Sequence, residues 1–369
     1  MRRKSSANLL PERRHELSSI LHESPSSQSV VARPTDLEAL GPILSRRFKA
    51  YGPDAKRSIL QLVTTGAAFA AMLVVMAAAS HEHYWLTLLL AIPAAGLLVR
   101  LFIIQHDCGH GSFFRSRVSN DVVGRALSVL TLTPYGHWKQ GHAAHHASTG
   151  NLDRRGRGDV ETWTVAEYQA STRLKKLFYR LYRNPFVMVG IGAPLNFILL
   201  QRLPTGHAFR DSEALRSILS LNVALLLAFG LAIAMLGALP VLGTYLPVII
   251  IASWVGNWLF YVQHQFDETH WERDGDWNFH VAAVIGSSYF QLPRILQWFS
   301  GNIGLHHVHH LCSRVPNYRL EACHNAAPEL RDVTRVVTLR SSLAGWQLAL
   351  WDEHRRALVA FRDLRYLPQ

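Results

Sequence analysis

The sequence predicts an all-α integral membrane protein with four transmembrane helices in two hairpins, interfacial helices and a cytosolic helical cap. Hydrophobic residues make up 49% of the 369 residues and charged residues only 17%, below the ~25% charge of a typical soluble domain. Four segments are apolar over the length that crosses a bilayer. Short clusters of histidine lie beside these segments, and they indicate that the cap carries out chemistry.

The first predicted hairpin follows a polar N-terminal segment, residues 1–56, that is rich in Ser, Pro and Arg. Roughly the first 35 residues have the composition of a disordered chain. Residues 59–79 carry no charge, and residues 84–104 carry only Arg100. About 20 apolar residues span a bilayer as a helix. The four polar residues between the two stretches therefore predict a tight transmembrane hairpin.

The second predicted hairpin consists of residues 217–236 and 241–263, which are joined by a short uncharged connection. Between the hairpins, residues 185–200 are apolar but contain Pro194. About 16 residues are too few for a straight span. We therefore expect this segment to be re-entrant or to lie in the membrane interface.

The distribution of basic residues predicts the orientation. The connections within the two hairpins carry no Lys or Arg, whereas residues 154–183 hold eight. The positive-inside rule then places both termini and the histidine clusters on the cytoplasmic side of the inner membrane. The net charge of +12 fits a protein that faces an anionic leaflet, although simple solubility explains it equally well, and we expect no nucleic-acid partner.

Three parts follow from this pattern: a polar cytosolic segment (1–56), a membrane domain with its cytosolic cap (57–322) and a cytosolic helical C-terminal segment (323–369). Helical periodicity is visible in residues 118–132 and 343–358. No stretch alternates as a sustained strand does. The polar segments outside the spans are expected to pack together as one cap.

The histidines recur at helical spacings near predicted membrane exits. HDCGH places two imidazoles at i and i+4, whereas HAAHH and HHVHH share the spacing i, i+3, i+4, which puts each set on one helix face. Each motif alone is compatible with a surface role. Nine imidazoles on one membrane face exceed the three or four ligands of a single zinc ion and indicate two metals. The nine are His106, His110, His142, His145, His146, His264, His306, His309 and His310.

HDCGHGSFF, GHWKQGHAAHHASTGNLD and GNIGLHHVHHL resemble the three histidine boxes of the integral-membrane fatty acid desaturases. Longer stretches, among them FYVQHQFD and VPNYRLE, resemble bacterial acyl-lipid desaturases of the Bacillus cold-shock type, over about residues 57–322. The resemblance implies two iron ions in a non-haem di-iron centre, held by the eight box histidines with His264 as an additional ligand. It implies O2-dependent introduction of a cis double bond into an acyl chain carried by a lipid or another acyl carrier.

Other reactions remain open, because related hydroxylases and carotenoid-modifying oxygenases share the three boxes. A non-catalytic membrane metal-binding protein or transporter is the alternative of another class. A transporter is expected to place ionisable residues inside its spans, and the four apolar stretches contain few. His307 points away from the HxxHH face of its helix and is left out of the expected ligands.

Ligating imidazoles usually donate their second N–H to a carboxylate or carbonyl. Acids close to the boxes are therefore candidates for that role: Asp107, which could bond a neighbouring box, Asp159 and Asp267. In the resembling acyl-CoA desaturases, an Asn one turn before the additional histidine reaches a metal through water. Here that position is Phe260. The residues that could take over the role of that Asn are Asn257, Gln263 and Asn302.

Four aromatic residues flank the boxes and could line an acyl tunnel: Trp138, Trp258, Tyr261 and Trp298. The alternative is an interfacial aromatic belt, and for Trp258 the belt or helix packing is favoured. Electrons must come from outside, because the chain has no CxxC pair and no GxGxxG fingerprint. We expect an acidic ferredoxin or flavodoxin to dock on the basic cap, where Arg154, Arg155 and Arg157 could attract it or a lipid phosphate.

Overall fold

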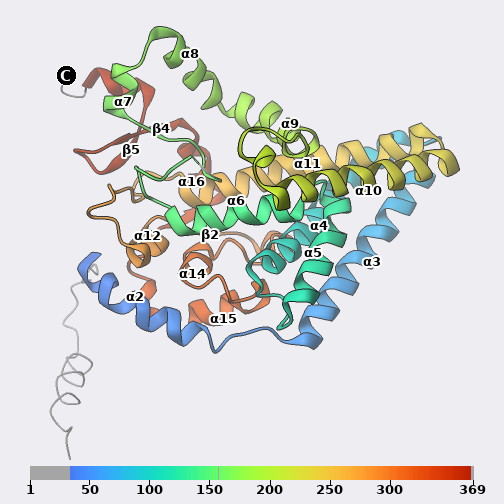
Figure 1. Ribbon diagram of the computed structural model, residues 1–369, viewed down its shortest axis with the longest axis horizontal. Helices are drawn as coiled ribbons and strands as arrows, with labels where there is room; N and C mark the ends of the chain where they lie inside the picture. Colours follow the sequence, from blue (N-terminus) through green and yellow to red (C-terminus); the bar gives the residue numbers. More distant parts are fainter. Residues whose placement is uncertain (1–33, 157, 367–369) are drawn as a thin grey trace, which may run out of the picture.

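Figure 1 shows a computed structural model of the protein, which describes residues 34–156 and 158–366. The predicted disorder near the N-terminus falls almost wholly outside these residues. Within the described chain, four helices are long and apolar enough to cross a membrane, as the sequence predicts. They are α3 (Ala55–Ala79), α4 (Tyr84–His110), α10 (Ser212–Leu236) and α11 (Ala238–His264).

The first hairpin pairs α3 with α4. The Asp54 side chain caps α3 by accepting from the Arg57 backbone N–H at 3.0 Å, which satisfies one of the free donors of the first turn. Helix α4 ends at His110 and is capped by Gly111, whose φ of 65° suits glycine. The helix continues six residues beyond the predicted apolar stretch, so the first histidine box belongs to the span helix itself.

The second hairpin pairs α10 with α11, and its sharp connection uses Gly237 at a φ of 88°. Helix α11 runs on to His264. In the apolar window of α4, 56% of the residues are buried, against 17% in those of α3 and α10. Helix α4 is therefore central, and α3 and α10 present most of their apolar side chains outward.

The segment between the hairpins is bent. Helix α8 (Arg173–Tyr182) precedes a π-helix, η1 (Phe186–Gly192), then α9 (Ala193–Ile198) and η2 (Leu200–Arg202). The axis turns by 61° at the break after α8. Residues 186–202 follow this bend, and together with α8 they are long and apolar enough for a broken span or a re-entrant loop. The expectation that residues 185–200 are re-entrant or interfacial stays a prediction.

Shorter helices gather at the histidine-bearing ends of the spans (Figure 1) and form a cap. Helix α5 (Arg117–Thr131) confirms the helix predicted over residues 118–132. The other α-helices of the cap are α2 (Pro34–Phe48), α6 (Tyr135–Ser148), α7 (Val165–Ala170), α12 (Phe279–Ile285), α13 (Arg294–Phe299), α14 (His306–Leu311), α15 (Leu320–Asn325) and α16 (Leu339–Ala344). The remaining 3-10 turns are η3 (Gly206–Phe209), η4 (Asn317–Arg319), η5 (Pro328–Leu330), η6 (Gly345–Gln347) and η7 (Phe361–Tyr366).

The C-terminal segment differs from the prediction, because the helix expected over residues 343–358 is wrong. Strands β4 (Leu348–Asp352) and β5 (Ala357–Ala360) form an antiparallel pair there, and β1 (Trp163–Thr164) joins β4 in parallel. Ala349, Leu350 and Trp351 are all at most 2% exposed, so burial on both faces hides strand alternation. A second small sheet pairs β2 (Tyr289–Gln291) with β3 (Val336–Thr338).

The C-terminal strands belong to the same cap. The Tyr179 hydroxyl donates to the Ala349 carbonyl at 2.6 Å, and the buried Arg183 donates to the Leu348 carbonyl at 2.8 Å. The boundary predicted between residues 322 and 323 falls inside α15. The C-terminal residues therefore join the cap, as expected of the polar segments outside the spans, but with strands where a helix was expected.

Candidate metal centre

The nine histidines singled out from the sequence converge from four helices. Helix α4 carries the first box, α6 the second, α11 the additional histidine and α14 the third box. They form two groups, and in each group one nitrogen per ring lies within 4.8 Å of all the others. The larger group is His106, His110, His142, His146 and His309; the smaller is His145, His264, His306 and His310.

Several imidazole nitrogens face one another, and the N–H protons of neutral rings cannot give each of these nitrogens a hydrogen bond. Nε2 of His309 lies 3.0 Å from Nε2 of His146, which is itself 3.2 Å from Nε2 of His142. In the smaller group, Nε2 of His306 lies 3.0 Å from that of His264 and 3.1 Å from that of His310. A neutral imidazole has one N–H and one lone pair, so converging Nε2 atoms suit metal ions that accept several lone pairs.

Two further ring nitrogens support the interpretation that the histidines bind metal ions. Nε2 of His110 and Nε2 of His145 are buried and have no hydrogen-bond partner within the described chain. A buried polar atom without a partner costs free energy, and one metal in each group would use both. The groups adjoin, since the His146 ring stacks on His310 with centroids 4.1 Å apart. The donor set fits two metal ions close together.

The electrostatics of the cluster favour neutral imidazoles. Desolvation lowers the pKa of five histidines on α6 and α14 well below the usual value for histidine, and the neighbouring imidazoles lower it further. The residues concerned are His142, His146, His306, His309 and His310. Neutral rings keep the lone pair that a metal needs.

A tight turn positions the third box. Gly301 and Asn302 both have positive φ, of 56° and 58°. A Cβ on Gly304 would lie 2.4 Å from the Phe290 carbonyl oxygen, so this position accepts only glycine without a backbone shift. The GNIG stretch thereby turns the chain directly into α14 and its inward-facing histidines.

Asp107 holds the first box. Its Oδ1 accepts from Nδ1 of His106 at 3.2 Å, and its Oδ2 accepts from the backbone N–H and the side-chain amide of Asn317 at 2.7 and 2.8 Å. The expectation that Asp107 would bond a neighbouring box is wrong. It bonds its own box and ties it to η4, which follows the third box.

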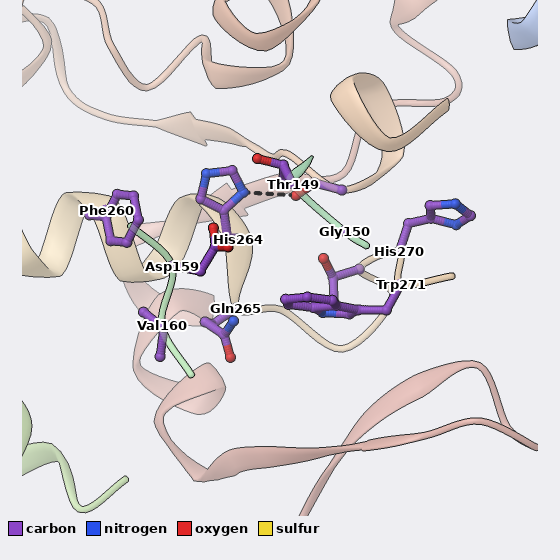
Figure 2. Close-up of a pocket in the computed structure, with 11 residues that line it drawn as sticks. Thr149, Gly150, Asp159, Val160, Phe260, His264, Gln265, His270 and Trp271 are labelled. Atoms are coloured by element: carbon purple, nitrogen blue, oxygen red, sulfur yellow. Dashed lines mark hydrogen bonds between the residues drawn. The ribbon is translucent and has the colours of Figure 1, made fainter. Parts of the chain in front are cut away.

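A carboxylate and a backbone carbonyl orient two imidazoles of the smaller group. The Asp159 carboxylate contacts Nδ1 of His145, as the sequence suggested for this acid. Nδ1 of His264 donates to the Gly286 carbonyl at 3.0 Å, the bond dashed in Figure 2. Both bonds place the N–H on Nδ1 and leave Nε2 free to bind a metal.

Two of the other polar candidates do not reach the centre. Asp267 is 56% exposed and pairs with Arg335 at 3.3 Å. Asn302 donates to the Asn317 carbonyl at 3.3 Å, because it forms the turn before α14. Asp267 supports no ligand imidazole, so its assignment is wrong, whereas a water-mediated role for Asn302 stays a prediction.

Phe260 lies beside the smaller group, and Asn257 and Gln263 line the large cavity with it. The Phe260 ring centroid is 5.2 Å from that of His145 and 5.6 Å from that of His264. The Gln263 amide donates to the Ile303 carbonyl at 3.1 Å. Nδ2 of Asn257 is buried without a partner within the described chain. A water-mediated role for Asn257 or Gln263 stays a prediction.

A cavity of about 1120 Å³ adjoins the histidines. It is larger than most small-molecule sites, which measure ~300–1,000 Å³. His106, His142 and His306 line one end, and Trp138 stacks on His142 there with centroids 4.6 Å apart and planes at 16°. Among the described residues that line it there is no Lys or Arg. Apolar residues of α4 and α11 line its other end: Leu98, Val99, Ile249 and Ala252.

Three of the four predicted tunnel residues lie elsewhere. Trp258 packs against Trp346 with centroids 4.6 Å apart, in agreement with helix packing. The Tyr261 hydroxyl donates to backbone carbonyls of the C-terminal segment. Trp298 is 46% exposed and lies under the Arg100 guanidinium at 4.2 Å. Only Trp138 of the four lines the cavity.

A second, much smaller cavity of about 10 Å³ lies beside His264 (Figure 2), with room for about one water. Asp159, Val160 and Phe260 line both cavities. These three side chains therefore separate the large apolar cavity from the small one.

The basic residues expected to attract a partner are partly neutralised. Arg154 pairs with Asp274 at 2.8 Å, and Arg155 pairs with Glu167. Arg157 lies outside the described residues. Arg154 stays 59% exposed in its ion pair, so attraction of a lipid phosphate or an acidic carrier to these residues stays a prediction.

Sequence reasoning missed Asn317 and the Gly286 carbonyl. Asn317 stands in the VPNYRLE stretch, whose likeness to desaturases was the only signal. A backbone carbonyl leaves no signal in a sequence, so Gly286 could not have been found. The Gly286 carbonyl orients the His264 imidazole directly, and Asn317 acts through Asp107, which contacts His106.

Comparison with known proteins identifies the family. The fatty acid desaturase family profile matches residues 83–338. The chain is 41% identical to a fatty acid desaturase of Bacillus subtilis over 326 residues, 88% of this chain and 92% of that protein. It is 29% identical to the sn-1 oleoyl-lipid 12-desaturase of Synechocystis sp. over 241 residues, 63% of this chain and 65% of that one. It is also 29% identical to the sn-2 acyl-lipid omega-3 desaturase (ferredoxin) of Helianthus annuus, over 69% of this chain and 58% of that one. The chain belongs to the fatty acid desaturase family.

Proposed function

We propose that this desaturase introduces a cis double bond into the acyl chain of a membrane lipid at a two-iron centre held by the nine histidines. One observation carries the proposal: imidazoles of both metal groups form one end of an apolar cavity. An acyl chain in the cavity would therefore lie against both metal positions. The balanced reaction converts –CH2–CH2–, O2, two electrons and two protons into –CH=CH– and two waters.

The cavity walls bind and orient the chain. Ile249 and His264 are 15 residues apart on α11, so the cavity extends ~22 Å from the centre at 1.5 Å per residue. Leu98 and Val99 lie two turns before His106 on α4. The lining is mostly apolar, although Asn196, Gln201 and Asn257 also contribute, so it resembles the environment that an acyl chain has in a bilayer.

Neighbouring residues hold the rings of the metal-binding histidines in one tautomer and orientation. Bound iron would supply the activation of O2 that removal of hydrogen from an unactivated CH2 group requires. Asp107, Asp159 and the Gly286 carbonyl each accept from Nδ1 of a ligand histidine. Trp138 packs flat on His142 and limits the rotation of that ring at the cavity wall.

The electrons are proposed to come from a ferredoxin or flavodoxin. The sequence contains no dinucleotide fingerprint and no iron–sulfur cysteines, and one relative is named as a ferredoxin-dependent enzyme. The protein is proposed to lie in the cytoplasmic membrane with both termini and the histidines on the cytoplasmic side, on the distribution of Lys and Arg.

Expression in a host that lacks unsaturated acyl chains tests the proposal. We expect new monounsaturated lipids, located by mass spectrometry with double-bond assignment, and iron in the purified protein. His145→Ala serves as the inactive control, because it removes one ligand of the smaller group. A product that gains one oxygen would indicate a hydroxylase instead. An unchanged lipid profile despite bound iron and a competent donor would contradict the proposal.

A further inference from the structure

Helix α8 is anchored to the cap by one face. The Tyr179 hydroxyl donates to the Ala349 carbonyl, and its ring stacks on Trp163 with centroids 4.3 Å apart. Arg180 donates to the Tyr168 hydroxyl at 2.7 Å, and Lys176 donates to the Gln169 carbonyl at 2.8 Å. This face of α8 is therefore held by the small sheet and α7.

The other face of α8 is an exposed apolar ridge. Leu174, Leu177, Phe178 and Leu181 are 61%, 53%, 61% and 46% exposed. Their spacing of i, i+3, i+4 and i+7 places them in one stripe. Contiguous apolar patches on a protein surface mark a contact with a membrane or a partner. No other part of the described chain packs against the stripe, so we expect a membrane or another molecule to contact it.

The ridge is continuous with surfaces that face lipid. Helices α8 and α9 follow one another along one edge of the molecule (Figure 1). Phe186, at the start of η1, is 80% exposed, and Ile191 is 65% exposed. The segment packs on α11, where Trp254 donates to the Gly190 carbonyl at 3.0 Å. The outward side of η1 thus continues the exposed face of a membrane span.

The same bent segment also forms a wall of the large cavity. Tyr182, at the end of α8, lines it, as do Val187 and Met188 of η1. The outward side of this wall is apolar and its inward side faces the acyl site. The bend of 61° lies between α8 and η1, so the ridge leads directly to the edge of the cavity.

The charge of α8, taken together with its apolar ridge, favours a lipid surface. The helix holds four basic residues and no acid: Arg173, Lys175, Lys176 and Arg180. Basic residues on one face, with Leu and Phe on the other, are typical of helices that lie in the plane of an anionic membrane surface.

We propose that α8 lies in the headgroup layer of an anionic bilayer with its ridge toward the acyl chains, and that the adjoining wall formed by η1 admits lipid acyl chains sideways into the cavity. The second part rests on the proposed function. The first part does not, because it concerns only the position of α8.

Depth measurements test the position of α8. Phe178→Cys carries a fluorophore on the ridge, and Lys175→Cys carries it on the basic side of the same helix. The native cysteines Cys108, Cys312 and Cys323 are buried, so labelling is directed to the new site. The protein is reconstituted in vesicles of phosphatidylcholine and phosphatidylglycerol.

We expect lipids with brominated acyl chains to quench the probe at 178 several-fold more than the probe at 175, and aqueous iodide to show the reverse order. Strong iodide quenching at 178 without quenching by brominated lipid would overturn the proposal. So would protection of 178 from both quenchers, which would indicate that a second copy or another protein covers the ridge.

A variant tests the lateral entrance. Phe178→Glu should lower lipid desaturation in vesicles several-fold while iron content and thermal midpoint stay at the wild-type level. Phe178→Leu, which keeps the ridge apolar, should retain activity. Equal activity of Phe178→Glu and wild type in vesicles would overturn the proposal of a lateral entrance. Absence of desaturation by the wild type would instead count against the proposed function and leave the depth result standing.

Discussion

The Asn317 side chain and backbone N–H both donate to one oxygen of Asp107, at 2.8 and 2.7 Å, across 210 residues of sequence. The other oxygen of Asp107 faces Nδ1 of His106. The Gln61 amide of the first span donates to Oδ1 of Asn317 at 2.9 Å. A buried chain of polar groups therefore links the first span, the first box and the segment after the third box.

Asn317→Ala should weaken iron binding. The change removes one donor to Asp107 and leaves the buried Gln61 amide without its partner, at a cost of about 1–3 kcal/mol in the free energy of unfolding. Loss of a group that orients a ligand typically lowers metal affinity ~10–100-fold. Chelator competition measures that affinity. Asn325→Ala, at an exposed position, is the control, and equal affinity of both variants would contradict the expectation.

His309 and His307 should behave differently on mutation. His309→Ala removes a member of the larger metal group and should abolish desaturation and lower the iron content. His307 lies outside both groups, with Nε2 3.1 Å from Nδ1 of His324, so His307→Ala should retain iron and part of the activity. Iron per protein and lipid products measure both. Equal loss in the two variants would contradict the assignment of faces on α14.

Ala252→Phe should shift substrate use toward shorter acyl chains. Ala252 lines the cavity 12 residues before His264 on α11, about 18 Å from it at 1.5 Å per residue. A phenyl ring there fills the far end of the cavity. Acyl-chain analysis by mass spectrometry measures the shift. Val255→Phe, on the exposed side of the same helix, should leave the chain-length profile unchanged, and the same shift in both variants would refute the assignment of the cavity.

The metal-free protein should lose stability as the pH falls below about 6.5, the ordinary pKa of histidine. Desolvation lowers the pKa of His142, His146, His306, His309 and His310 in the folded state. The unfolded chain then binds more protons at low pH, so stability is full above the ordinary pKa and falls on acidification. Each histidine contributes up to ~1.4 kcal/mol per pH unit.

Denaturant titrations between pH 8 and pH 5 measure this dependence after metal removal by a chelator. His307→Gln is a useful comparison, because burial lowers the pKa of His307 to about 3 and the variant should flatten the pH dependence slightly. Unfolding midpoints that stay constant over this range would show that the cluster does not remain neutral in the folded protein.

The sequence predicted correctly what depends on local pattern and spacing. Apolar length predicts the four spans, and helical spacing predicts which histidines of each box share a face, with His307 pointing away. It failed where partners come from distant segments. Leu350 stands in a stretch with helical periodicity, but it is completely buried in β4, between strands β1 and β5.

The sequence by itself therefore determined the four apolar spans and the nine histidines, because a helix converts spacing into direction without help from other elements. Only the tertiary structure decided how those histidines divide into two groups, that Asn317 and the Gly286 carbonyl orient them, and that Trp138 alone of the four aromatic candidates faces the cavity. The physical reason is packing: which side chains meet depends on how four helices and two small sheets close around one another.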